Sequence, residues 1–143
     1  MDKKNMPVGS FSFAIEIEGI QEASFMKVSA IAQEVEVETY EEGGMNHFVH
    51  QLPVRTKYSN VVLERGMTNS TELMNWFNQI KEGIIIKKNF SIILYDQRGN
   101  SVRRWDFFGG YPVKWEASDL DAMSSNMMIE KIEITHEGMR ENN

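Results

Sequence analysis

A serine and a lysine three residues apart, Ser24 and Lys27, match the Ser-x-x-Lys pattern in which a lysine helps to activate a nucleophilic serine. That chemistry needs the serine at the start of a helix and the partner motifs Ser-Asp-Asn and Lys-Thr-Gly, and neither motif occurs in this sequence. The chain also contains no Gly-x-Ser-x-Gly, no Gly-x-Gly-x-x-Gly and no Walker lysine loop. We therefore expect a protein that is not an enzyme and that uses no cofactor.

Acidic residues late in the chain follow part of a calcium-binding loop. Asp119, Asp121 and Glu130 stand at its first, third and twelfth positions. Met123 and Ser124 occupy the fifth ligand position and the position of the required glycine. The pattern therefore favours an acidic surface loop over a calcium site.

Two histidines, His47 and His50, are the remaining candidate metal ligands. A spacing of three residues places them on opposite faces of an extended chain, so joint ligation of a metal would require a turn. We expect solvent-facing or interface histidines and no metal site.

Length and composition indicate one globular domain, residues 1–143. A chain of this length buries roughly 70% of its unfolded surface, and 41% hydrophobic and 25% charged residues are ordinary globular proportions. With no cysteine, no disulfide can hold the fold. The net charge of −6 argues against nucleic acid as the main partner, since phosphate binding needs a basic surface.

The longest apolar runs are a few residues, such as residues 84–86, so we expect no membrane insertion. The N-terminus lacks the apolar stretch of a secretion signal. We expect synthesis in the bacterial cytoplasm.

Alternation of apolar and polar residues predicts β-strands over much of the chain. In one of them Val35 and Val37 alternate with glutamates, so its outer face is a ladder of carboxylates. Another alternating pair flanks the turn at residues 96–100, where Gly99 predicts a hairpin. The predicted strands are residues 11–17, 24–31, 35–40, 58–65, 90–95 and 102–107.

A long connection follows the carboxylate strand. Residues 41–57 begin with Glu41, Glu42, Gly43 and Gly44 and predict an extended loop. Loops of this length in compact domains are uncommon and usually have a function.

One helix is predicted at about residues 70–82. Asn69 and Glu72 fit a capping box, and Gly83 stands where a helix commonly ends. An apolar stripe at helical spacing should face the sheet; it consists of Leu73, Trp76, Phe77 and Ile80. The fold class is therefore α+β and mainly β, with one packed helix.

An ordered set of short motifs resembles the tail-tube proteins of contractile phages and related injection systems. It begins with Glu-Gly-Gly-x-Asn at residues 42–46, Leu-Pro at 52–53 and Leu-x-Arg-Gly at 63–66. It ends with Tyr-Pro-x-Lys-Trp at 111–115 and His-Glu-Gly at 136–138. Each motif is weak alone, but together they span roughly residues 8 to 139, and the ordered set is specific.

This resemblance implies a tail-tube fold, in which two packed antiparallel sheets form a barrel-like sandwich with one flanking helix. It further implies homohexameric rings that stack into the hollow inner tube of a contractile tail or injection system. Such a tube conducts DNA or protein cargo after the sheath contracts. The implied partners are other copies of this chain, the sheath protein, the baseplate and tube-terminating proteins, and luminal cargo, without specific nucleic-acid recognition.

The long loop and the closing His-Glu-Gly are the segments that we expect at the contacts between subunits. Opposite charges in the loop suit reciprocal contacts between neighbouring copies. The predicted interface residues are Glu41, Glu42, Gly43, Gly44, Asn46, Arg55, Lys57, His136 and Glu137.

Two other classes compete with a tube subunit. The first is a small monomeric β-barrel that binds a peptide or small molecule among its methionine and aromatic side chains. The second is a small hydrolase. A pocket binder should stay monomeric and melt at a higher temperature with its ligand, whereas a tube subunit should form rings as its concentration rises.

Overall fold

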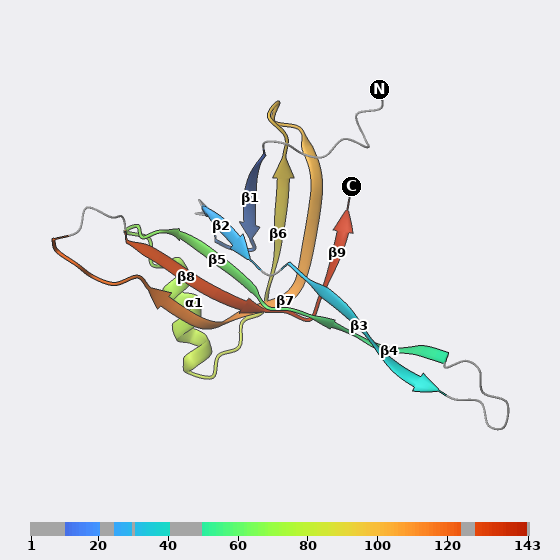
Figure 1. The fold of residues 1–143 in the computed structure, drawn as a ribbon. Helices are drawn as coiled ribbons and strands as arrows, with labels where there is room; N and C mark the ends of the chain where they lie inside the picture. The colour runs from blue at the N-terminus through green and yellow to red at the C-terminus, as the bar shows by residue number, and fades with distance from the viewer. Residues whose placement is uncertain (1–10, 21–24, 30, 41–49, 124–127, 143) are drawn as a thin grey trace.

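Strands dominate the described part of the chain, as the alternating pattern predicts (Figure 1). The computed structural model describes residues 11–20, 25–29, 31–40, 50–123 and 128–142. These residues form nine strands and one helix. The elements are β1 (Ser12–Ile17), β2 (Lys27–Ser29), β3 (Gln33–Tyr40), β4 (His50–Tyr58), β5 (Val61–Gly66), α1 (Glu72–Lys81), β6 (Lys88–Tyr95), β7 (Ser101–Ala117), β8 (Ile129–Thr135) and β9 (Gly138–Asn142).

The long strand β7 joins two halves of one antiparallel sheet. The strand order is β1-β6-β7-β8-β5-β2, and β9 also pairs with β7. The first half of β7 pairs with β6 and β9, and its second half pairs with β8. We call β1, β6, β9 and the first half of β7 the first half-sheet, and β2, β5, β8 and the second half of β7 the second half-sheet.

Two glycines mark the point where β7 passes from one half-sheet to the other. Gly109 has a φ of +63°, which disfavours a side chain. A Cβ at Gly110 would lie 2.8 Å from the ring of Phe90. The glycine pair thus provides both the backbone geometry and the space that the core needs at this bend.

The core lies between the two half-sheets, with α1 packed against it. Alternate residues of both half-sheets point inward, as in the row Val28–Leu63–Ile132–Trp115 across the second half-sheet. The buried cluster consists of Ile15, Ile17, Ile20, Phe25, Val61, Leu63, Leu73, Trp76, Phe90, Ile92, Phe107, Ile132 and Ile134.

The predicted packing of antiparallel sheets with one helix is confirmed, with a difference in how the sheet ends. Among the described residues, the strand path begins at β1 and ends at β2, and no strand pairing closes it into a barrel. A sheet with open ends leaves backbone donors and acceptors available to another chain.

The helix α1 is present where it was predicted, but its start differs. Thr71 occupies the N-cap position and makes no side-chain capping hydrogen bond, so the predicted capping box of Asn69 and Glu72 is wrong. Packing of Leu73 and Trp76, both buried, replaces capping as the force that holds the helix.

The end of α1 follows the prediction. Gly83 has a φ of +87°, and its N–H donates to the carbonyl of Ile80 at 3.0 Å. The N–H of Ile84 donates to the carbonyl of Gln79 at 2.9 Å. These two bonds form a Schellman motif, in which glycine supplies the left-handed residue.

The predicted hairpin between β6 and β7 is also confirmed. Gly99 has a φ of +83°, and its N–H donates to the carbonyl of Asp96 at 3.1 Å. The carboxylate of Asp96 accepts hydrogen bonds from the backbone N–H groups of Arg98 and Asn100, each at 2.9 Å.

The predicted loop at residues 41–57 is wrong in its second part. Residues from His50 onward form β4, which pairs with β3 along its length. Pro53 was read as a loop residue, but it stands beside a β-bulge, where proline is tolerated. Residues 41–49 lie outside the described part of the chain.

One ion pair is buried in the core. The Nε of Arg65 donates to Oε2 of Glu130 at 2.9 Å, and the Nε1 of Trp115 donates to Oε1 of the same carboxylate at 2.8 Å. The guanidinium of Arg65 also lies 5.5 Å from the centre of the Phe25 ring. This network connects β5, β7 and β8 inside the second half-sheet.

Candidate assembly interface

Strands β3 and β4 form a two-stranded arm that extends away from the rest of the molecule (Figure 1). Every residue of β3 except Glu36 is exposed, and so is every residue of β4 except Tyr58. An isolated two-stranded ribbon is at best marginally stable in water. The arm is therefore a candidate for contact with another chain.

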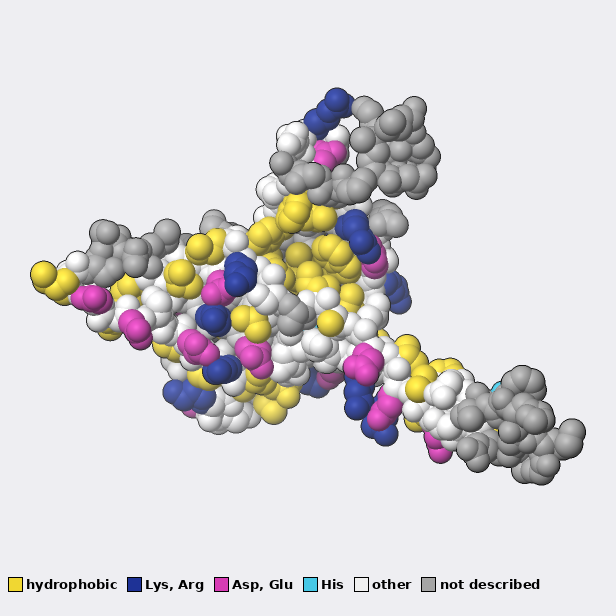
Figure 2. Space-filling model, viewed as in Figure 1, with side chains coloured by type: hydrophobic (Ala, Val, Ile, Leu, Met, Phe, Trp, Pro, Cys, Tyr) yellow, Lys and Arg dark blue, Asp and Glu magenta, His cyan; other side chains and the backbone are white. Residues whose placement is uncertain are grey.

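The two faces of the arm differ in chemistry. The strand register places Val35 opposite Thr56 and Val37 opposite Pro53, which gives an uncharged face. It places Glu34 opposite Lys57 and Glu36 opposite Arg55 on the other face. Figure 2 shows hydrophobic side chains along one edge of the arm and charged side chains along the opposite edge.

The uncharged face of the arm exposes apolar side chains to solvent. Val35 and Val37 are 54% and 52% exposed, and Val54 of β4, at the bulge beside Pro53, is 51% exposed. Burying an exposed valine stabilises a complex by roughly 25 cal/mol per Å² of apolar surface. A partner that covers this face would gain from each of these side chains.

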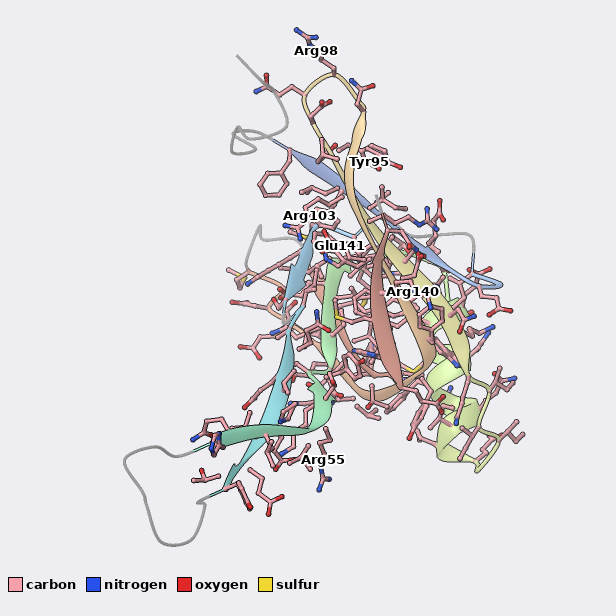
Figure 3. The ribbon with its side chains drawn as sticks, turned by 90° about the vertical axis from the view of Figure 1, so that its right-hand side faces the viewer. Arg55, Tyr95, Arg98, Arg103, Arg140 and Glu141 are labelled. Atoms are coloured by element: carbon pink, nitrogen blue, oxygen red, sulfur yellow. The ribbon has the colours of Figure 1, made fainter. Side chains whose placement is uncertain are left out.

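Two predicted interface residues lie on the charged face of the arm. The Nε of Arg55 lies 2.8 Å from a carboxylate oxygen of Glu36, and the Nζ of Lys57 lies 3.5 Å from the other oxygen (Figure 3 labels Arg55). Both basic side chains therefore have a partner within their own arm. The predicted residues Glu41, Glu42, Gly43, Gly44 and Asn46 lie outside the described residues.

The predicted residue His136 lies at the base of the arm. Its ring centre is 5.6 Å from that of Tyr58, the last residue of β4. One ring nitrogen is 3.0 Å from the carbonyl oxygen of Ser59, and the other is 3.2 Å from that of Gly138. His136 thus connects the root of the arm to the start of β9.

Glu137 is separate from this contact although it is the next residue in sequence. Its carboxylate is exposed and forms an ion pair with Lys87, which raises the pKa of that lysine. Its backbone N–H donates to the carbonyl of Phe108 at 2.8 Å. The structure thus brings His136, but not Glu137, to the root of the arm.

Two residues that matched chemical patterns in the sequence, Glu130 and His50, have other partners in the structure. Glu130 lies in the buried pair with Arg65, and His50 packs against Tyr40 with ring centres 6.1 Å apart. Within the described ranges, no group of three or more His, Cys, Asp or Glu side chains could hold a metal ion. Across the same ranges, no helix has the length and apolar character needed to cross a membrane. Ser24 and His47 lie outside the described residues.

The terminal strand β9 is held to β7 by ionised carboxylates. Hydrogen bonds, first from Ser91 and then from Arg104 and Asn142, lower the pKa of Asp106. A hydrogen bond from Arg103 lowers the pKa of Glu141, and Figure 3 shows these two side chains next to each other. A carboxylate with a lowered pKa stabilises the fold above its ordinary pKa, and this contribution is lost as the pH falls through the folded value.

We therefore expect the free energy of unfolding to fall between about pH 5 and pH 3, with about 0.2–1 kcal/mol lost per partly exposed pair. Urea unfolding of dilute protein at pH 7 and pH 3 measures this loss. The variant Asp106→Asn should be less stable at pH 7 and should lose less on acidification. An unchanged pH dependence in the variant would contradict the assignment.

The exposed uncharged face of the arm was not predicted from the sequence, although the residues that form it stand in the sequence. The alternation of Val35 and Val37 with glutamates predicted a strand correctly. The pattern could not show that no described part of the chain packs against the face that carries Val35 and Val37. A strand with proline in its partner and carboxylates on one face is one signal for an edge ribbon outside the core.

Comparison with known proteins gives a consistent result. A family model described as "T4-like virus tail tube protein gp19" matches residues 9–140. No curated protein matches the chain in a sequence search. Among solved structures, a chain of the anti-feeding prophage baseplate is 26% identical with a TM-score of 0.80, and the match covers 96% of each chain.

Two further structures share the fold. A chain of the sheath-tube complex of the extracellular contractile injection system PVC is 21% identical with a TM-score of 0.83. That match covers 96% of this chain and 93% of the other. Hcp1 from Flavobacterium johnsoniae is 18% identical with a TM-score of 0.59, covering 90% of this chain and 93% of the other.

Proposed function

This chain belongs to the T4-like virus tail tube protein gp19 family, and from that premise we propose that six copies close into a ring and that rings stack into a hollow tube. Residues 1–143 act as one tail-tube domain in this assembly. The protein is a structural subunit of the inner tube of a contractile tail or contractile injection system.

The observation that carries this proposal is the arm. The apolar side chains on the uncharged face of the arm are about half exposed, and no other described strand packs against them. A two-stranded ribbon of this kind needs contact with another chain to be stable. A contact between an arm and a different surface of the next copy is heterologous. Such contacts close into rings when the rotation closes and continue as open stacks when it does not.

The charged face of the arm suits the same role. Glu36, Arg55 and Lys57 form a local group that a neighbouring copy can join, and rim charges of this kind fix register more than they add affinity. We propose that Glu41, Glu42, Gly43, Gly44 and Asn46 continue this contact beyond the described strands. His136 connects the root of the arm to β9, and Glu137, exposed and apart from that contact, offers its carboxylate to a neighbouring copy.

The related structures support the proposed partners. One relative comes from a baseplate, one from a sheath-tube complex, and another similar chain from a tube-terminating cap. We propose that this chain likewise contacts sheath, baseplate and terminating proteins and surrounds a cargo of DNA or protein. It would be made in the bacterial cytoplasm and assembled there into the particle.

Neither competing class is favoured. Two open depressions in the described surface, one lined mainly and the other half by Lys and Glu side chains, differ from the apolar pockets that bind small molecules. We propose that the chain has no catalytic role, because its family consists of structural tube proteins.

Shortening the arm is expected to abolish tubes without unfolding the subunit. Glu38 and Leu52 face each other in the strand register, so an Asn-Gly turn can replace residues 39–51 between them. The shortened arm keeps the pairs of Glu36 with Arg55 and Lys57. Negative-stain microscopy and light scattering should show monomers where the full chain gives rings and tubes.

A point variant tests the same contact with less disturbance. Val37→Glu places a charge on the uncharged face and should prevent assembly, while Gln97→Glu adds the same charge at an exposed turn and should not. Both variants should melt within a few degrees of the parent as monomers, since exposed substitutions usually change stability by less than about 0.5 kcal/mol. Normal tubes from Val37→Glu and from the shortened arm would refute the role of the arm.

A further inference from the structure

Both ring nitrogens of His136 face a backbone carbonyl oxygen. Nε2 lies 3.0 Å from the oxygen of Ser59, and Nδ1 lies 3.2 Å from the oxygen of Gly138. A carbonyl oxygen only accepts hydrogen bonds, so each contact needs a proton on the ring nitrogen. A neutral imidazole carries one N–H and can donate to one of the two carbonyls, whereas the doubly protonated imidazolium donates to both. The geometry therefore matches the charged form of the ring.

The two carbonyls belong to different parts of the fold. Ser59 follows the last residue of β4, and its N–H donates to the carbonyl of Ala32, just before β3, at 3.1 Å. Ser59 is thus bonded at the root of both strands of the arm. Gly138 is the first residue of β9, which pairs with the first half of β7. A ring that bonds to both carbonyls ties the arm to the first half-sheet.

Aromatic side chains hold the His136 ring in place. The rings of Phe90 and Phe107 are stacked with centres 4.6 Å apart, and the plane of His136 is nearly perpendicular to both, at 83° and 81°. The ring centre of Tyr58 lies 5.6 Å from that of His136, and a Cβ at Gly138 would lie 3.7 Å from the same tyrosine ring. Contacts with three aromatic rings leave His136 little freedom to turn away from the two carbonyls.

The carboxylates closest in sequence to this histidine have other partners. Glu137 forms an ion pair with Lys87, and Glu133 accepts a hydrogen bond from Asn60 at 2.9 Å. The titratable side chain that contacts the ring is Tyr58, and a tyrosine is ordinarily neutral below about pH 9. The second proton of the ring therefore serves the two carbonyls and not a neighbouring negative charge.

We propose that His136 is a proton-controlled latch for the arm. Its doubly protonated ring bonds Ser59 at the arm root to Gly138 of β9, and loss of one proton breaks one of these two bonds. A histidine changes charge between about pH 5 and pH 8, so the latch is closed at the acidic end of this range and open at the alkaline end. An interaction that only the cation makes stabilises the closed root at low pH, and this contribution is lost as the pH rises.

The consequence of the latch for assembly rests on the proposed function. An arm with an open root has more conformational freedom, and it loses that freedom when it docks on a neighbouring copy. Protonation of His136 should therefore favour rings and tubes, and a rise in pH should weaken them. The subunit would assemble most readily under mildly acidic conditions.

Hydrogen exchange in the arm of the dilute full chain tests the latch without any need for tubes. The backbone N–H groups of β3 and β4 should be about three- to tenfold better protected at pH 5.5 than at pH 8.5, after correction for the intrinsic pH dependence of exchange. This is the effect expected of one hydrogen bond from a charged donor at a partly exposed site. Carboxylates, lysines and arginines ordinarily keep their charge over this range, so they do not produce the difference.

Two histidine variants assign the effect. His136→Gln removes the titration and keeps a side chain that can donate to one carbonyl, so its arm should show the lower protection at both pH values. The matched control is His50→Gln, which removes a histidine from β4 itself and should keep the pH dependence of the parent. Equal pH dependence in the parent and in His136→Gln, or none in the parent, would overturn the latch.

The ring itself gives a second measurement that needs no variant. The chain has three histidines, so a nitrogen-15 spectrum of the imidazole rings is simple, and His136 is identified by its proximity to the ring protons of Phe90 and Phe107. At pH 5.5 both of its N–H protons should be visible, because hydrogen bonds shelter them from exchange with water, and at pH 8.5 only one should be. A ring with a single N–H proton at pH 5.5 would reject the latch even if His136→Gln fails to fold.

Tube formation separates the latch from the function that it serves. Light scattering of the parent should show a lower critical concentration for tubes at pH 5.5 than at pH 8.5. The difference should be smaller in His136→Gln, because the general effect of pH on the net charge is common to both chains. An equal difference in both would show that the latch does not control assembly. A latch found in the dilute chain, with no tubes at any pH, would support the latch and contradict the proposed function.

Discussion

Arg65→Met is expected to lower the free energy of unfolding by about 3–5 kcal/mol, the loss measured when one partner of a buried ion pair is removed. The side chains of Arg65 and Glu130 are 2% and 7% exposed. Without the guanidinium, the carboxylate keeps the hydrogen bond from Trp115 but stays buried with uncompensated charge. Urea unfolding of the dilute monomer measures the loss.

A second substitution separates lost charge balance from lost packing. In the double variant Arg65→Met with Glu130→Gln, the buried pair is replaced by neutral side chains, and the amide oxygen can still accept from Trp115. At least about 2 kcal/mol should be recovered, because neutral replacements of buried pairs are often tolerated. A double variant that is less stable than Arg65→Met alone would show that the arginine acts through packing on Phe25 and not through its charge.

Trp76→Ala should destabilise the fold by a similar amount, about 3–5 kcal/mol, as a large-to-small change in the core. Trp76 is 2% exposed, and its Nε1 donates to the carbonyl of Ile86 at 2.7 Å. The substitution opens a cavity under α1 and leaves that carbonyl without its indole partner. For a chain of this length the melting temperature should fall by roughly 10–15 °C.

Phe77 is the matched control, because it is the next residue on the same helix. The predicted stripe included both rings, but only Trp76 is buried, and Phe77 is partly exposed beside Lys81. Phe77→Ala should therefore cost less than half as much as Trp76→Ala. Equal losses would mean that the two side chains bury similar area and that the orientation of α1 is different.

Prediction from sequence succeeded where the signal is local. The helix end at Gly83 and the hairpin turn at Gly99 follow from the backbone freedom of glycine, and both are found. It failed at the start of α1, where Asn69 and Glu72 matched a capping box that packing made unnecessary. It also failed at residues 50–57, where Pro53 suggested a loop and pairing with β3 made a strand.

The candidate interface was predicted only in part for the same reason. The opposite charges of Arg55, Lys57 and the nearby glutamates were visible in sequence, but their pairing with Glu36 needed the register of β3 and β4. That His136 lies at the root of the arm depends on contacts with Tyr58 and Ser59, more than 70 residues away. Such contacts leave no periodic trace in the chain.

The sequence by itself determines the family, the mainly β fold class with one helix, and the absence of a recognisable catalytic motif. Motif order, periodicity and residue type are all properties of the chain. Only the tertiary structure decided that β7 serves both half-sheets and that Arg65 and Glu130 meet inside the core. Strand register and order are set by the packing of all the strands together, and a shift of one residue would move each of these side chains to the opposite face.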